Sequence, residues 1–196
     1  MKNNKFILTG FVIVAIAQLF VPVNMIVNNH LILSKGVELK FETAPVDPVD
    51  PFMGRYVLLQ YNENKVKVDN ERDWKPGQKI FVILTGNSEG FAQCSSASKE
   101  RPDGQMLYVK ARVDHVSTDG SNTLTIYYPF DRFYMEETKA PEADSLYRHA
   151  HSDSTQTGWA LVAIREGDAV LKDVFIGGSS LKELIEQRRQ DRSHLE

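Results

Sequence analysis

The sequence predicts a mainly β domain of the α+β class: an antiparallel, β-rich domain with one inserted helix and a C-terminal helix, after an N-terminal transmembrane helix. Three observations predict this fold class. Residues 6–27 are apolar almost throughout. The chain that follows holds short runs of β-branched and aromatic residues bounded by Gly, Pro, Asn or Asp. Two later segments, 142–150 and 179–196, have helical composition or periodicity.

The first feature along the chain is a predicted membrane anchor at Phe6–Val27. As a helix, this apolar segment would span the hydrocarbon layer of a bilayer, which is ~30 Å thick. A cleaved signal peptide is the alternative, because lysines precede the segment and Ala15–Ala17 has the A-x-A pattern of a cleavage site. Apolar sequence continues over Leu19–Val27, beyond that pattern, so the length favours a retained transmembrane helix. The segment is interrupted by Thr9, Gly10, Gln18, Pro22 and Asn24.

Positive charge precedes the anchor at Lys2, Lys5 and the amino terminus, whereas only Lys35 follows it closely. This bias favours a cytoplasmic N-terminus and an exported bulk. Beyond the anchor, the helix is expected to extend as a membrane-proximal stalk, and Gly36 is expected to end it in a left-handed conformation.

The rest of the chain has the length and apolar fraction of one modest domain with a real core. We divide the chain into an anchor and short stalk at 1–35, a β-rich exported domain at 36–178 and a C-terminal amphipathic helix at 179–196. The formal net charge is -3, and no block of Lys and Arg is interleaved with aromatic residues. Nucleic-acid binding is therefore not expected.

Strand patterns fill the exported domain. Val37–Glu42 alternates apolar and charged residues, which predicts a half-buried strand, and Arg55–Tyr61 is apolar on both faces, which predicts a central strand. The other runs lie beside turn sequences that contain Gly, Pro or Asp, in an order typical of a meander. They are Lys79–Leu84, Met106–Val113, Thr123–Tyr128, Trp159–Arg165 and Ala169–Ile176. The last two, separated by three residues, form the clearest hairpin.

Two helices are predicted in the second half of the chain. Glu142–Ala150 has the Ala, Glu and Leu content of a helix, and Pro141 can occupy its first turn, where no N–H is needed. In the C-terminal helix, Leu181, Leu184 and Ile185 share one face.

The most specific pattern in the sequence is Gly54, Arg55, Tyr56, Leu59 and Tyr61, which follows a proline-punctuated loop. Its spacing resembles that of the GDYxxLxY family of bacterial membrane-anchored proteins, with coverage from the anchor to about residue 178. The resemblance implies a family of uncharacterised activity, so it names no reaction. Arg55 stands where the family motif has Asp, so no role of that carboxylate carries over. Combined with the charge bias, the resemblance implies a bacterial inner-membrane protein whose bulk faces the periplasm.

The loop before the motif is a candidate ligand or partner site. Asp47 and Asp50 could bind a cation or act as an acid and base pair, but Asp beside Pro is also an ordinary turn arrangement, which we favour. Tyr56, Leu59 and Tyr61 could line a ligand groove. Aromatic residues at strand spacing more often pack in the core or across strands, and we favour that structural interpretation.

No metal or cofactor is predicted. His149 and His151 form the only close His pair, and we interpret them as solvated residues of a polar loop because no third ligand is evident. Cys94 is the only cysteine, so it cannot form an internal disulfide. We interpret it as a small buried side chain.

Two functional hypotheses remain. The first is an accessory or interaction subunit of the cell envelope, which offers the Pro-rich loop or the last helix to a membrane-protein partner. The second is a membrane-tethered peptidase, because Gly54–Leu58 and Tyr108–Val113 faintly resemble segments of the signal-peptidase family. The stretch before Gly54 contains no Ser that Lys110 could activate. We therefore assign no catalytic residue and favour the accessory subunit, with its partner left open.

Overall fold

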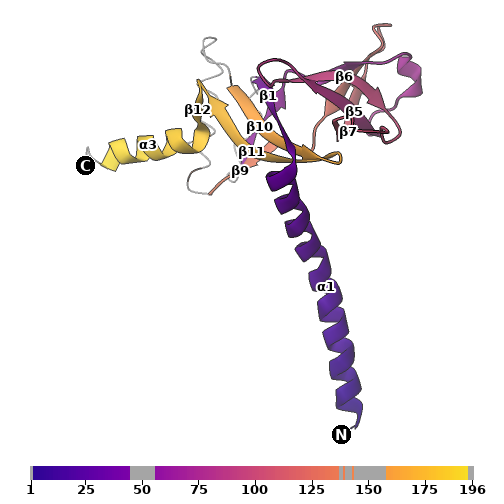
Figure 1. Ribbon diagram of the computed structural model, residues 1–196, viewed down its shortest axis with the longest axis vertical. Helices are drawn as coiled ribbons and strands as arrows, with labels where there is room; N and C mark the ends of the chain where they lie inside the picture. Colours follow the sequence, from indigo (N-terminus) through magenta and orange to yellow (C-terminus); the bar gives the residue numbers. More distant parts are fainter. Residues whose placement is uncertain (1, 45–55, 137–138, 140–142, 144–157, 194–196) are drawn as a thin grey trace.

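The computed structural model describes residues 2–44, 56–136, 139, 143 and 158–193, and it shows a β domain from which two helices project in different directions (Figure 1). Helix α1 (Lys2–Lys35) and helix α3 (Leu181–Ser193) leave the domain at separate places. Strand pairing within the described sheets is antiparallel. The predicted β-rich fold with its N-terminal apolar helix and C-terminal helix is therefore confirmed. The helix predicted at 142–150 lies outside the described residues, apart from the buried Ala143.

The described strands form two larger sheets and one small one. The first sheet has the order β12 (Ser179–Ser180), β11 (Asp168–Ile176), β10 (Gly158–Arg165), β1 (Val37–Ala44) and β3 (Gln60–Tyr61). The second has the order β4 (Lys65–Lys67), β8 (Thr123–Tyr127), β7 (Tyr108–Val116), β5 (Lys79–Gly86) and β6 (Ala92–Ser98). The small sheet pairs β2 (Tyr56–Leu58) with β9 (Arg132–Tyr134), and a short 3-10 helix, η1, covers Glu71–Asp73.

The strand predicted at Arg55–Tyr61 divides into two short strands in different sheets. β2 pairs with β9, whereas β3 pairs with the end of β1. Between them, the amide of Leu59 donates a hydrogen bond of 2.7 Å to the carbonyl of Asp131. The chain therefore changes partners at Leu59, and a run that is apolar on both faces serves two sheets in turn.

The core is one cluster of buried side chains from all three sheets. Phe41 on β1 is 0% exposed and lies near its centre. Its ring makes edge contacts with Tyr61, Tyr128 and Phe130 at centroid distances of 5.6, 5.4 and 5.0 Å. Such edge-to-face pairs contribute about 0.5–1.5 kcal/mol each beyond the burial of their area. This cluster therefore joins β1 and β3 to the segment that follows β8.

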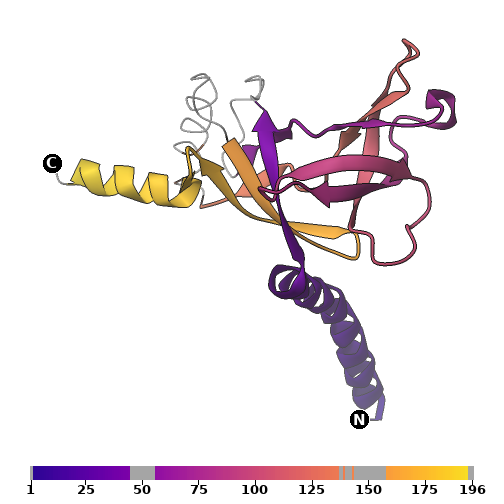
Figure 2. The ribbon, with the colours of Figure 1, turned by 45° about the horizontal axis from the view of Figure 1, so that its top comes forward.

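The tip of the β10–β11 hairpin holds the two larger sheets together (Figure 2). Glu166 and Gly167 have positive φ values of 53° and 85°, as a two-residue turn of type I′ requires. Gly167 bridges Val109, and its carbonyl accepts a hydrogen bond of 2.8 Å from the amide of Lys110. The tip thus lies directly against β7.

Helix α1 is long and apolar enough to cross a membrane, and its apolar side chains are exposed along most of its length. Near its C-terminal end it packs on β10 and β11, and Ile32 is only 2% exposed. Gly36 does not adopt the expected left-handed conformation. A Cβ there would lie 2.5 Å from the carbonyl oxygen of Ile32 and 3.1 Å from the backbone of Ile164, so close backbone packing requires the glycine.

Candidate functional site

The residues of the sequence motif occupy different environments. Leu59 and Tyr61 are buried, and the Tyr61 hydroxyl donates a hydrogen bond of 2.7 Å to the carbonyl of Phe130. Tyr56 is half-buried and lies opposite Tyr134 across β2 and β9, with ring centroids 5.5 Å apart. Leu59 and Tyr61 therefore belong to the core, while Tyr56 belongs to an outer aromatic pair. The other predicted site residues, Asp47, Asp50, Gly54 and Arg55, lie outside the described residues, as do His149 and His151.

A polar cluster at the edge of the second sheet contains Cys94, which lies on β6. The Tyr128 hydroxyl donates a hydrogen bond of 2.7 Å to the carbonyl of Glu63, and the Cys94 sulfur lies 3.0 Å from the Tyr128 oxygen. The amide of Cys94 donates to the Glu63 carboxylate at 3.2 Å. Burial raises the pKa of the Cys94 thiol to about 11. The cluster fastens the chain between β3 and β4 to the edge strand β6, and its thiol is held in the protonated, unreactive form.

This pKa gives a direct prediction for Cys94. A rise from an ordinary value near 9 to about 11 lowers the thiolate population at neutral pH about a hundredfold. We expect iodoacetamide to alkylate the folded chain at least that much more slowly than the urea-unfolded chain at pH 7.5. Mass measurement after timed quenching gives both rates. Equal rates would mean that Cys94 is accessible and ionised, and would make it a candidate reactive group.

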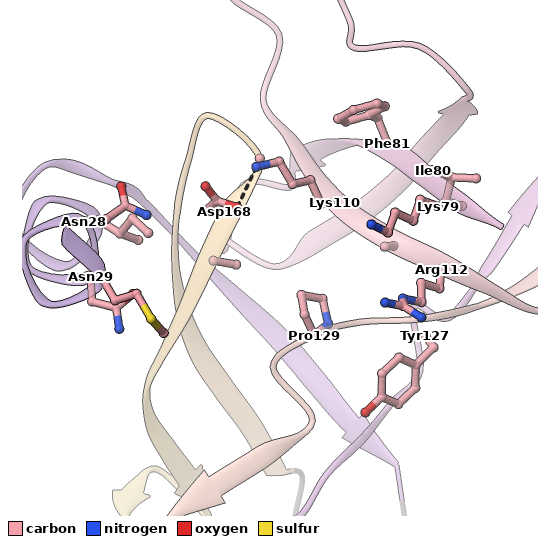
Figure 3. Close-up of a pocket in the computed structure, with 15 residues that line it drawn as sticks. Asn28, Asn29, Lys79, Ile80, Phe81, Lys110, Arg112, Tyr127, Pro129 and Asp168 are labelled. Atoms are coloured by element: carbon pink, nitrogen blue, oxygen red, sulfur yellow. Dashed lines mark hydrogen bonds and ion pairs between the residues drawn. The ribbon is translucent and has the colours of Figure 1, made fainter. Parts of the chain in front are cut away.

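The described residues form a groove between the end of α1, strands β5 and β7, and the tip of the β10–β11 hairpin (Figure 3). We call it the anchor groove, and its volume is about 710 Å³. Helix α1 contributes Asn28, Asn29 and the apolar Met25 and Ile32. Three basic residues and one acidic residue line the groove from the β domain: Lys79, Lys110, Arg112 and Asp168.

The strand register explains how the basic residues converge. β5 and β7 pair so that Lys79 lies directly opposite Arg112, and Arg112 in turn lies opposite Tyr127 on β8. Directly opposed residues share one face of a sheet, so all three side chains face the groove. Partial burial and a hydrogen bond to the Asp131 carboxylate raise the pKa of Tyr127 to about 12, so its phenol stays neutral. It therefore provides no counter-charge for Arg112.

The charges of the groove are only partly neutralised. Lys110 Nζ lies 2.7 Å from Asp168 Oδ1, with the two side chains 51% and 45% exposed. Exposed pairs of this kind contribute only about 0–1 kcal/mol. Neither Lys79 nor Arg112 forms an ion pair with a carboxylate of the described chain. The groove therefore carries an excess of positive charge.

The position of Lys110 does not favour the peptidase hypothesis. A Ser/Lys mechanism requires a neutral amine in contact with a serine hydroxyl. In the part of the chain described, the Lys110 side chain instead donates to Asp168. The described residues also contain no group of three or more His, Cys, Asp and Glu side chains that could hold a metal ion.

Sequence reasoning did not find the anchor groove. The alternation within 79–84 and 108–113 places Lys79, Lys110 and Arg112 on the polar side of two predicted strands. This alternation is the sequence pattern that could have indicated a basic face on the sheet. It does not reveal which strands are neighbours, or that α1 packs beside them.

Comparison with known proteins identifies one match. A sequence model of a protein family, described as GDYXXLXY protein, matches residues 18–174. No curated protein and no solved structure matches the chain significantly.

Proposed function

This chain belongs to the GDYXXLXY protein family, and on that premise we propose that it is a membrane-anchored accessory subunit without catalysis of its own. The β domain is held at the outer surface of a bacterial inner membrane, faces the periplasm and assembles with an integral membrane protein. Along the chain, residues 1–35 act as anchor and stalk, residues 36–178 as the exported domain and residues 179–196 as a terminal helix. The exposed span of α1, with a polar side chain at its centre, carries the proposal.

The short junction between anchor and domain supports a role at the bilayer surface. Helix α1 ends at Lys35 and β1 begins at Val37, so Gly36 alone separates them. The Gly36 amide donates a hydrogen bond of 2.8 Å to the carbonyl of Ile32, which is itself buried against the domain. A junction of this kind holds the domain close to the membrane and limits its rotation, unlike a flexible linker.

The span itself supports a partner within the membrane. Gln18 lies close to the midpoint of Phe6–Val27, and its side chain is exposed on the surface of α1. Lipid tails offer no hydrogen-bond partner to an amide at that depth. Polar side chains in spans commonly bond across to a neighbouring helix, which stabilises association by about 0.6–2 kcal/mol. Gln18 is therefore suited to contact another transmembrane helix.

Crosslinking in native membranes tests this proposal. We expect one membrane protein to co-purify in fixed stoichiometry with the wild-type chain. Replacing Gln18 with leucine removes the amide and should lower recovery of the partner about threefold to thirtyfold. Gln18→Asn keeps an amide and is expected to retain most of the recovery.

Two results would contradict the proposal in different ways. Recovery of the wild-type chain alone would exclude a stable accessory subunit. If the partner were recovered equally well with Gln18→Leu, the contact between the chain and its partner would lie outside the centre of the span.

A further inference from the structure

The anchor groove combines apolar lining residues with two cations, Lys79 and Arg112, that form no ion pair with the described carboxylates, beside a helix suited to spanning a membrane. We propose that it binds the head and upper acyl region of one anionic glycerophospholipid from the bilayer that α1 spans. This site goes beyond the proposed accessory role. It requires the membrane anchor but no protein partner.

The position of the groove along α1 is the first argument. Met25 lies in the last turn of the apolar segment, and Asn28 and Asn29 are the first two consecutive polar residues after it. A span of about 20 residues ends there at the boundary between hydrocarbon and headgroups. Since these three residues line the groove, it lies at the depth where phospholipid phosphates are found.

The charge arrangement is the second argument. Lys79 and Arg112 lie directly opposite each other on β5 and β7, and like charges in that position destabilise a sheet. Figure 3 shows both side chains on the side of the groove that faces Asn28 and Asn29. A phosphate between them would relieve the repulsion and accept charge-assisted hydrogen bonds from both. Lys110 can add to the field, although its ammonium is already shared with Asp168.

The apolar lining is the third argument, and it selects a lipid over a soluble anion. Phe81 and Ala169, both half-buried, line the groove beside the charged residues, and Met25, which is 62% exposed, continues this surface along α1 toward the hydrocarbon. A free phosphate would leave these side chains uncovered. The groove volume of about 710 Å³ lies within the ~300–1,000 Å³ range of small-molecule sites and can hold more than a phosphate group.

Native mass spectrometry of the full chain, purified in mild detergent and stripped of lipid, measures the binding directly. Dioleoyl phosphatidylglycerol and zwitterionic dioleoyl phosphatidylcholine are the two probes. We expect one phosphatidylglycerol to bind more tightly than phosphatidylcholine. The double variant K79Q/R112Q should weaken phosphatidylglycerol binding about thirtyfold, since each basic residue near an anionic lipid contributes about fivefold.

The matched control is K65Q/K67Q, which removes two exposed lysines of β4 and the same net charge. It should change phosphatidylglycerol affinity less than about threefold. As a second readout, a photoreactive phosphatidylglycerol should label peptides from β5, β7 and the end of α1 in the unmodified chain. That readout does not depend on the folding of any variant.

Three outcomes would overturn the proposal. Equal affinity for the two lipids would exclude recognition of the anionic head. An equal loss in both double variants would indicate diffuse attraction to net charge. Displacement of the lipid by millimolar glycerol 3-phosphate would show that soluble anions satisfy the site. The purified chain contains no partner, so none of these outcomes depends on the crosslinking result for Gln18.

Discussion

Replacing Phe41 with alanine is expected to lower the free energy of unfolding of the β domain by about 4 kcal/mol. The side chain is 0% exposed and contacts three aromatic rings that come from β3 and from the segment between β8 and β9. Removing the Phe41 ring leaves a cavity surrounded by β-strands. The backbones of these strands are fixed by their hydrogen bonds to one another, so they cannot move in to fill the cavity. The loss therefore includes both the burial of the ring and the unfilled space.

Thermal unfolding of the full chain in detergent, followed by tryptophan fluorescence, measures this loss for Phe41→Ala. The matched control is Tyr134→Ala, because Tyr134 is also an aromatic residue on a strand but is 64% exposed. Its pairing with Tyr56 is worth about 1 kcal/mol. Similar losses in both variants would show that the aromatic cluster around Phe41 is not the centre of the core.

The elements that the sequence predicted well are those whose apolar pattern is local and long. The hairpin predicted at Trp159–Arg165 and Ala169–Ile176 agrees within one residue at each boundary with β10 and β11. Alternation in Val37–Glu42 likewise identified β1. In these runs the strand period, the flanking turn residues and the burial all favour the same structure.

Strands with weak local patterns were missed or merged. β6 (Ala92–Ser98) contains mainly Ser and Ala, so no β-branched or aromatic run marks it, and its pairing with β5 creates it. The division of Arg55–Tyr61 at Leu59 could not be predicted either, because the division depends on two different partners, β9 and β1. Strand propensity is context-dependent in this way.

The motif that identifies the family is informative about packing more than about chemistry. Leu59 and Tyr61 are buried, and Tyr61 is hydrogen-bonded to the backbone that follows β8. The anchor groove, by contrast, depends on the register that sets Lys79 against Arg112 and on the side of the domain where α1 emerges. Residues far apart in the chain meet there, and no local pattern in a single sequence indicates that such residues are neighbours.

The hairpin tip that borders this groove gives the second large expected effect. Gly167→Ala should lower the free energy of unfolding by about 3 kcal/mol. Gly167 has a φ of 85°, which costs an alanine about 1 kcal/mol. Its Cβ would also lie 2.5 Å from Cε2 of Tyr108, a buried ring that packs edge-on against Phe81 at 5.7 Å. Either that ring or the tip must move, and movement of the tip would break its hydrogen bond with Lys110.

Gly104→Ala separates the two contributions, because Gly104 has a similar φ of 82° but no atom within 4 Å of the added Cβ. Unfolding measured as for Phe41→Ala should show a loss of about 1 kcal/mol for this control. The remaining difference of about 2 kcal/mol then reports the contact between the tip and Tyr108. If the two glycine variants lost equal stability, the tip would not be pressed against β7. The position of Asp168 beside Lys110 would then have to be explained by contacts other than those of Gly167.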